Sequence, residues 1–303
     1  MASTAEIKSR IDSIMETRKI TNAMYLIAST KLRRARSELE QTRPYFDALR
    51  SEIKRVFRTA NDVDSHYFYP PDQEPELPGT YGCLVITADK GLAGAYNQNV
   101  LKEAQRLLED HSDTKLFVVG EYGRRFFTQH HIPIERMFLY TAQNPTLDRA
   151  REISAMLLDQ YDRGLLKKIF VIYTDMENGL TACVHSTRLL PFHRTYFTPL
   201  EKEKKIMVPF EFEPSVSAVL NGIMHSYLTG FIYSALIDSF CSEQQARMTA
   251  MDSANRNAEE LLADLSLQYN RVRQAAITQE ITEVTAGAKA QRKKRRKKEV
   301  QVS

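Results

Sequence analysis

The strongest constraint on this sequence lies in its C-terminal third, which contains no proline after Pro214. Steps that alternate between three and four residues, from Val216 to Gln279, meet an apolar side chain at fourteen of nineteen positions, whereas 43% hydrophobic residues would give about eight. Such a row is the seam of a left-handed coiled coil. A helix from Ser215 to about Ala286 would be roughly 105 Å long at about 1.5 Å per residue, so part of it must extend beyond any compact core.

The N-terminal segment carries a matching seam. Between Ile7 and Val56 the same steps meet an apolar side chain at twelve of fifteen positions. Pro44 lies inside this stretch, and because proline removes a backbone hydrogen bond we expect a kink or break near Arg43. The two ends are therefore predicted to pair. The alternative is a pair of ordinary amphipathic helices folded onto the middle of the chain, which their uninterrupted length disfavours.

The distribution of charge favours the same pairing. The first sixty residues carry 13 Lys and Arg against 7 Asp and Glu, whereas residues 211–288 carry 4 against 10. Opposite net charges attract and orient two helices, although salt screens the effect. The last fifteen residues, 289–303, hold eight basic residues and one acidic residue. We interpret them as a solvated, disordered tail; electrostatic binding of nucleic acid or anionic lipid is the alternative.

The middle of the chain predicts a compact α/β domain. Short apolar runs at Tyr81–Thr87, Lys115–Gly120 and Lys168–Thr174 are typical of buried strands, with Glu135–Tyr140 a weaker fourth. Helices are expected between them, which favours a mostly parallel, Rossmann-like sheet. Thr181–Leu190 should return antiparallel after a hairpin at Asn178-Gly179. The expected helices are Asn97–Leu108, Tyr122–Gln129 and Thr146–Tyr161.

These features define five segments and an α/β fold class, with a long antiparallel coiled coil of the terminal helices and a central Rossmann-like domain. The segments are an N-terminal coiled-coil helix (1–60), a linker (61–80) containing Pro70-Pro71 and Pro78-Gly79, the central α/β domain (81–210), a C-terminal coiled-coil helix (211–288) and the basic tail (289–303).

No residue pattern in the chain predicts a catalytic, cofactor or metal site. The turn Asp89–Gly94 follows a strand and precedes a helix, where phosphate-binding loops lie, but it matches neither the dinucleotide nor the Walker glycine pattern. We interpret its glycines as forming a tight turn. The seven histidines have no metal-ligand spacing, and the three cysteines lie too far apart in sequence to indicate a disulfide framework. No apolar run is long enough to span a bilayer.

Both ends and the central turn resemble one family, the bacterial type of F-type ATP synthase gamma subunit. The N-terminal signature is carried by Ile7–Ile11, Thr17–Met24 and Ala28–Ala35, and the C-terminal one by Ser242–Met251, Ala254–Ala258 and Tyr269–Glu283. Thr87–Gly94 resembles the family's glycine turn, with Ala93 in place of its usual cysteine. The tail extends past the usual family end. The chain has no inserted cysteine pair of the chloroplast type, and we expect no transit peptide and a bacterial enzyme.

The resemblance implies a rotor shaft that is not itself an enzyme. In this family the coiled coil enters a ring of three alpha and three beta subunits, while the α/β domain docks on the epsilon subunit and the membrane c-ring. Ion flow turns the c-ring, and the shaft drives the beta sites through different nucleotide affinities. The expected location is peripheral, on the cytoplasmic side of the cell membrane. No cofactor and no specific nucleic acid are expected.

Seven residues match family positions that contact a beta subunit or stabilise the shaft. The resemblance implies that Met24, Lys31, Arg33 and Arg34 lie near the acidic hinge of a beta subunit, and that Arg247, Gln274 and Thr278 contact beta loops or stabilise the shaft. The simpler interpretation is coiled-coil packing for Met24 and a solvated helix face for Arg247.

Two rival functions make different predictions. A coiled-coil nucleic-acid binder would lose salt-sensitive DNA binding when residues 289–303 are deleted. A small-molecule α/β enzyme would bind its ligand at the turn Asp89–Gly94. The rotor hypothesis predicts neither as the main activity.

Overall fold

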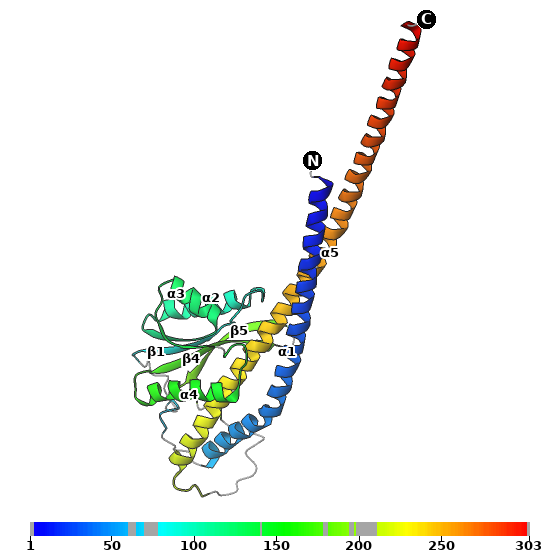
Figure 1. Ribbon diagram of the computed structural model, residues 1–303. Helices are drawn as coiled ribbons and strands as arrows, with labels where there is room; N and C mark the ends of the chain where they lie inside the picture. Colours follow the sequence, from blue (N-terminus) through cyan, green and yellow to red (C-terminus); the bar gives the residue numbers. More distant parts are fainter. Residues whose placement is uncertain are drawn as a thin grey trace. The chain divides into compact units, whose positions relative to one another are not determined.

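The computed structural model describes residues 3–59, 65–69, 78–139, 141–177, 181–193, 197 and 211–301. Contacts divide the chain into two units: an α/β unit, Leu26–Ala250, and a helix-end unit, Met1–Tyr25 with Met251–Ser303. The elements, in chain order, are α1 (Thr4–Thr59), β1 (Tyr81–Ile86), α2 (Tyr96–Asp110), β2 (Thr114–Val119), α3 (Glu121–Gln129), β3 (Ile134–Phe138), α4 (Leu147–Asp162), β4 (Lys168–Glu177), β5 (Thr181–Leu190) and α5 (Val216–Gln301) (Figure 1).

The α/β unit is built on a five-stranded sheet of order β3-β2-β1-β4-β5. The first four strands are parallel, and β5 pairs antiparallel with β4. Every predicted strand and helix of the middle segment is present, including the weaker strand, which forms the edge strand β3. The predicted Rossmann-like arrangement is therefore confirmed.

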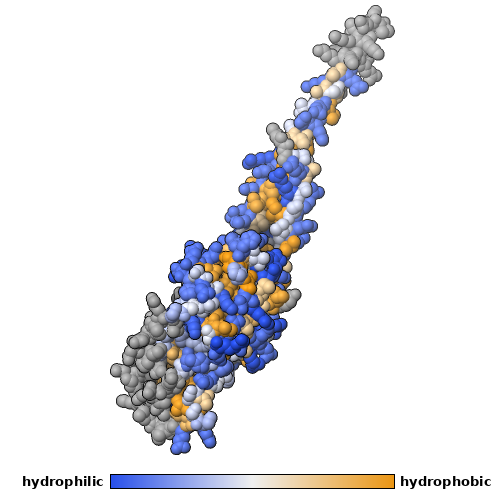
Figure 2. Space-filling model, turned by 90° about the vertical axis from the view of Figure 1, so that its left-hand side faces the viewer, coloured by the Kyte–Doolittle hydropathy of each residue, from blue (hydrophilic) through white to orange (hydrophobic). Residues whose placement is uncertain are grey.

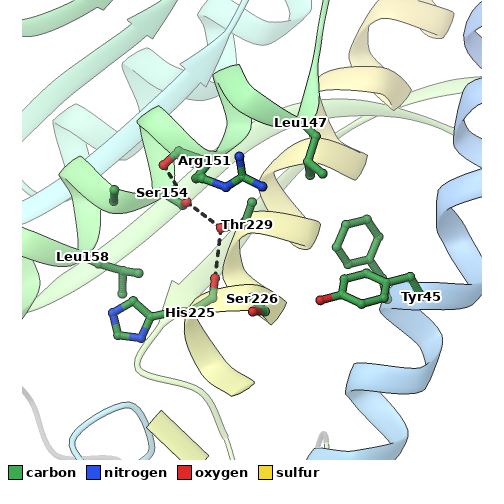
Figure 3. Close-up of a pocket in the computed structure, with 10 residues that line it drawn as sticks. Tyr45, Leu147, Arg151, Ser154, Leu158, His225, Ser226 and Thr229 are labelled. Carbon is green, nitrogen blue, oxygen red and sulfur yellow. Dashed lines mark hydrogen bonds between the residues drawn. The ribbon is translucent and has the colours of Figure 1, made fainter. Parts of the chain in front are cut away.

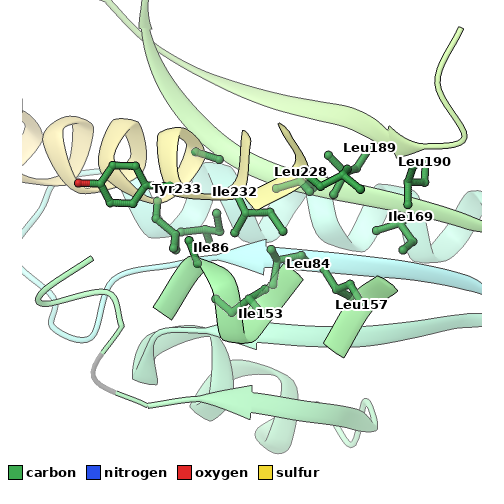
Figure 4. Packing of buried hydrophobic residues seen from close by; sticks show 14 of the residues in the cluster. Leu84, Ile86, Ile153, Leu157, Ile169, Leu189, Leu190, Leu228, Ile232 and Tyr233 are labelled. Atoms are coloured by element: carbon green, nitrogen blue, oxygen red, sulfur yellow. The ribbon is translucent and has the colours of Figure 1, made fainter. Parts of the chain in front are cut away.

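The two faces of the sheet are covered by different helices because side chains alternate along each strand. Cys83 and Val85 of β1 belong to the core that packs against α2 and α3. Leu84 and Ile86 point to the other face, into a larger core shared with α4, α5 and α1. Figure 4 shows Ile153 and Leu157 of α4, together with Leu228 and Ile232 of α5, around these two β1 side chains.

Within the α/β unit, α1 packs against α5. Leu32, Ala35, Ile53 and Val56 of α1 are buried in the same core as the inner face of α5. The two helices approach closely at Phe46, whose ring would overlap a Cβ placed on Gly230. A glycine on the seam of α5 therefore leaves the space that an aromatic side chain of α1 fills.

The helix-end unit is an antiparallel helix pair. Arg18 Nη1 lies 3.5 Å from Glu259 Oε1, and the Thr21 hydroxyl is hydrogen-bonded to Asn255. As the residue number rises on α1, that of its partner on α5 falls, which is the antiparallel order. Ile7, Met251 and Ala258 are the buried apolar side chains of this unit among its described residues.

The predicted seams are the buried faces of both helices. On α1, every seam position from Ile7 to Val56 is buried or half-buried except Arg18, whose partner is Glu259. On α5 the same holds from Val216 to Val272, whereas the last two predicted positions, Ala276 and Gln279, are exposed. The predicted coiled-coil pairing is confirmed, and its seam on α5 ends near Val272.

Two predicted helix features differ from the structure. Pro44 does not break α1, which is helical on both sides of it, and Figure 1 shows only a change of direction in the light-blue end of the helix. Packing of Phe46, Ile53 and Val56 against the core compensates for the one missing backbone hydrogen bond. The end of α5 predicted near Ala286 is too early, because the backbone is helical through Gln301.

Some predictions fall partly outside the described residues. Of the predicted linker (61–80), the structure describes 65–69 and 78–80, and Tyr67, Phe68 and Tyr69 are buried. The hairpin residues Asn178 and Gly179 are not among the described ones, although Glu177 pairs with Thr181 on either side of them.

The contact between Gly230 and Phe46 predicts opposite effects for two Gly→Ala substitutions in α5. Gly230→Ala should lower the free energy of unfolding by about 1–3 kcal/mol, because the added methyl group displaces the Phe46 ring. Gly222→Ala, where no atom lies within 4 Å of the added Cβ, should raise it by about 0.5–1 kcal/mol. Urea unfolding followed by circular dichroism measures both. Equal effects at the two positions would contradict the packing described here.

Candidate functional site on the paired helices

The basic residues predicted on α1 are exposed. Lys31, Arg33 and Arg34 all have exposed side chains, and Arg34 forms an ion pair with Glu38 one turn later, at 2.9 Å. Exposed pairs of this kind contribute little to stability. The three cations are therefore accessible to an acidic partner.

Met24 belongs to the helix-end unit, where its side chain is half-buried. This intermediate exposure fits packing beside the seam and also leaves part of the thioether chain accessible.

Arg247 differs from the solvated helix face considered above, because it is only 9% exposed. Its Nη1 lies 2.5 Å from Glu243 Oε1, one turn earlier on α5. Its Nη2 donates to the carbonyl oxygens of Lys90 and Gly91, at 3.4 and 3.1 Å. Arg247 therefore joins α5 to the turn between β1 and α2.

Glu243 is the buried counter-ion of this contact. Burial raises the pKa of its carboxyl, while the charges of Arg247 and of Lys31 on α1 oppose the shift. Two elements thus meet at one buried charge, α5 through Glu243 and Arg247 and the β1–α2 turn through its carbonyl oxygens. The sequence motifs did not reveal that Arg247 is paired with this buried carboxylate.

The turn Asp89–Gly94 is held in place by side chains around it. Asp89 Oδ1 accepts a hydrogen bond from the backbone N–H of Glu121, and Asn97 Oδ1 accepts one from that of Ala88, both at 2.9 Å. Gly94 has φ of 54°, which confirms the predicted role of glycine in a tight turn. Leu92 stands at the surface, 65% exposed.

Further hydroxyl groups attach α5 to the rest of the α/β unit. Ser239 Oγ accepts a hydrogen bond from the backbone N–H of Thr174 on β4, at 3.2 Å, and the Ser242 hydroxyl donates to the carbonyl oxygen of Thr174, at 3.3 Å. The hydroxyl of Thr229 on α5 lies 2.8 Å from the hydroxyl of Ser154 on α4. These polar contacts within a mainly apolar interface fix the axial position of α5, which hydrophobic packing alone leaves less defined.

A half-buried carboxyl group of α5, that of Asp238, feels charges on β4 and α1. Burial raises the pKa of Asp238 to about 6, and repulsion from Asp175 adds to the shift. A hydrogen bond from the Ser234 hydroxyl, at 3.1 Å, and the charge of Arg43 partly oppose it.

Gln274 and Thr278 lie on α5 in the helix-end unit, and both side chains are exposed. The Thr278 hydroxyl donates to the Gln274 carbonyl oxygen at 2.9 Å, a bond within the helix itself. Their described contacts therefore leave the Gln274 amide accessible.

The same part of α5 has exposed apolar side chains. From Arg273 to Gln291 every side chain is exposed. Ile277, Ile281 and Val284 are 44%, 62% and 73% exposed, and their spacing places them on one face of the helix. Figure 2 shows orange atoms among the blue ones on the stretch of α5 next to its grey end. An exposed apolar row on an isolated helix indicates a binding surface for another molecule.

The described residues contain no group of three or more His, Cys, Asp or Glu side chains arranged to hold a metal ion. Among the same residues, no helix is both long and apolar enough to cross a membrane.

Comparison with known proteins identifies the family. A family model described as ATP synthase matches residues 3–291. A relative from Caldanaerobacter subterraneus subsp. tengcongensis, named ATP synthase gamma chain, is 41% identical and covers 93% of this chain and 98% of its own. One from Acetivibrio thermocellus, with the same name, is 39% identical and covers 96% and 99%. A sodium-ion-specific gamma chain from Acetobacterium woodii is 36% identical and covers 94% and 97%.

Solved structures agree in fold. A chain of the central stalk and c-ring of the Tetrahymena thermophila mitochondrial ATP synthase matches with a TM-score of 0.58 and 26% identity, over 78% of this chain and 99% of that one. A chain from the Euglena gracilis mitochondrial enzyme matches with a TM-score of 0.68 over 95% and 94%, at 16% identity. The fold is thus that of α/β proteins whose two terminal helices pair with each other. The chain belongs to the ATP synthase gamma chain family.

Two substitutions of Arg247 should distinguish its contact with the β1–α2 turn from its ion pair with Glu243. Arg247→Lys keeps a cation beside Glu243 but loses the fork to the turn, and should lower the free energy of unfolding by about 1–2 kcal/mol. Arg247→Met leaves the Glu243 carboxylate buried without its partner and should cost about 3–5 kcal/mol. Adding Glu243→Gln to Arg247→Met should recover part of that loss. Urea unfolding of the four chains measures this, and an unchanged stability of Arg247→Met would contradict the buried ion pair.

Asp238 should make the stability depend on pH. Because its folded pKa of about 6 exceeds the usual value of 3.8, the folded state binds the proton more tightly, and stability falls as pH rises from about 4 through 6. Asp238→Asn should remove this loss. The free energy of unfolding of the variant, relative to that of the parent, should therefore rise by on the order of 2–3 kcal/mol between pH 4 and 8. The exposed Asp47→Asn controls for loss of one charge. A constant difference across this range would exclude the effect.

Proposed function

We propose that this chain is the central-stalk rotor subunit of an F-type ATP synthase. In this role it couples ion flow through the membrane sector to ATP synthesis and hydrolysis at the ring of alpha and beta subunits, and it carries no catalytic site itself. Family membership over residues 3–291 supports this, as does the likeness to a central-stalk chain at 26% identity.

The observation that carries the proposal is the exposed apolar face at the end of α5. Ile277, Ile281 and Val284 have no covering partner among the described residues, because the coiled-coil seam ends near Val272. A helix of this kind needs a sleeve supplied by other subunits. A ring of alpha and beta subunits around the shaft supplies such a sleeve.

Coupling requires that each shaft angle stabilise one conformation of a beta subunit over the others. A symmetric rod makes the same contacts at every angle and transmits nothing. The exposed cations Lys31, Arg33 and Arg34 make the surface of α1 uneven in charge, which supports their role in contacting an acidic hinge of a beta subunit. We assign Met24 to the same contact.

Torque also has to pass between the α/β domain and the helices. Arg247, Ser239 and Ser242 bond α5 to the β1–α2 turn and to β4, so a force on the sheet reaches α5 without slippage. We therefore assign Arg247 to stabilisation of the shaft, and Gln274 and Thr278 to contact with beta loops.

The partners follow from the same proposal. They are three alpha and three beta subunits around the coiled coil, with the epsilon subunit and the c-ring against the α/β domain. The chain is peripheral to the cell membrane through this complex, on its cytoplasmic side. It binds no nucleic acid as part of this function.

The test is assembly and coupling. The tagged chain, expressed in the cells that supply the other subunits, should co-purify with alpha and beta subunits, and the complex should hydrolyse ATP while pumping ions into vesicles. Met24→Lys, which adds a cation beside the beta subunit, should lower ion pumping per ATP hydrolysed several-fold, whereas the isosteric Met24→Leu should change it little. Absence of alpha and beta subunits would refute the proposed function. Normal pumping by Met24→Lys would refute only the contact assigned to Met24.

A further inference from the structure

A cavity of about 330 Å³ lies between three helices of the α/β unit. Tyr45 and Phe46 of α1 form one wall, residues of α4 from Leu147 to Leu158 form the second, and His225, Ser226 and Thr229 of α5 form the third. Its size is that of cavities that hold small organic ligands, about 300–1,000 Å³. None of its lining residues is among the seven that are assigned above to the beta-subunit contact or to stabilisation of the shaft.

Hydrogen-bond donors converge on this cavity. Figure 3 shows the Arg151 guanidinium and the Tyr45 hydroxyl pointing into the same space from α4 and α1, with the Ser226 hydroxyl below them. Arg151 also forms an ion pair with Asp148 at 2.8 Å, but that pair is exposed and weak, and the guanidinium has five N–H donors. Donors from three separate helices can therefore surround one acceptor group.

The charge of the lining is of one sign. Its ten residues include one arginine and one histidine but no aspartate or glutamate. His225 Nδ1 is hydrogen-bonded to the carbonyl oxygen of Asn221 at 2.9 Å, which directs Nε2 away from that bond. A cation would find no carboxylate in the lining, whereas an anion meets Arg151.

The rest of the lining is apolar. Phe46, Leu147, Ala155 and Leu158 present rings, methyl groups and methylenes to the cavity. The hydroxyls of Ser154 and Thr229 are already bonded to each other at 2.8 Å, so they do not require a ligand. The interior thus suits an apolar body, and the donors suit an anionic head.

We propose that this cavity is a binding site for a small organic anion that joins an aromatic or aliphatic body to a carboxylate or sulfonate group. The body packs against Phe46, Leu147 and Leu158. The anionic group accepts hydrogen bonds from Arg151 and the Tyr45 hydroxyl. A bound molecule joins α1 to α4 and α5 at a place where the chain itself leaves a gap.

The chain contains no tryptophan, which allows a direct test. Tyr45→Trp places a single tryptophan at the cavity, since Tyr45 is 58% exposed and tolerates a larger ring, and the indole N–H replaces the lost hydroxyl as a hydrogen-bond donor. Met137→Trp, at an exposed position on the edge strand β3, is the matched control. The probe is anilinonaphthalene sulfonate, an aromatic anion that quenches tryptophan by energy transfer. Titration of the full chain should give saturable one-to-one quenching in the Tyr45→Trp variant and much weaker quenching in the control.

Further variants identify the binding groups. Arg151→Gln should weaken binding of the sulfonate about tenfold, because a charge-assisted hydrogen bond is lost, and leave binding of uncharged phenylnaphthylamine within twofold. Arg149→Gln removes an arginine of α4 that does not line the cavity and should change neither. Ala155→Phe, at an exposed position facing the opening, should abolish binding by filling the space.

Circular dichroism of every variant verifies that it is folded. Equal quenching of the two tryptophans would overturn the proposal, as would equal affinities of Arg151→Gln and Arg149→Gln for the sulfonate. Undiminished binding to Ala155→Phe would also overturn it, because the probe would then bind elsewhere.

Discussion

The α/β unit depends on one helix that packs in two directions. The inner face of α5 buries Leu228 and Ile232 against the sheet and α4, while its seam receives α1 at Gly230. Neither the sheet face nor α1 would have a complete core without it. The inner half of α5 is therefore part of the domain and of the coiled coil at once, and loss of packing on either side weakens both.

Much of the fold could be predicted from the sequence because simple local patterns of apolar residues determine its helices and strands. Alternating three- and four-residue steps located the buried faces of α1 and α5. Short apolar runs located four strands, and the hairpin signal at Asn178-Gly179 located the fifth. The effect of Pro44 could not be predicted in the same way: a proline costs one backbone hydrogen bond locally, but the packing of Phe46 and Ile53 that outweighs it is a tertiary property.

The candidate site was only partly predictable for a similar reason. The family motifs indicated that Arg247 has a role, but they did not show that it lies buried between Glu243 and the carbonyls of the β1–α2 turn. Ser239 carried no sequence signal, and Ser242 was part of a family signature without an assigned role, since the role of a serine on a helix becomes visible only when a strand lies beside it. The cavity next to Arg151 likewise arises from three helices that are distant in sequence.

The contacts that attach α5 to the sheet limit which amino-acid substitutions this chain can accept. Arg247, Ser239 and Ser242 all bond to main-chain atoms, namely carbonyls or the N–H group of residues 90, 91 and 174. A main-chain partner is present whatever side chain occupies its position. Substitutions in the turn and in β4 are therefore free to accumulate without breaking the attachment, whereas the three helix side chains have no such freedom.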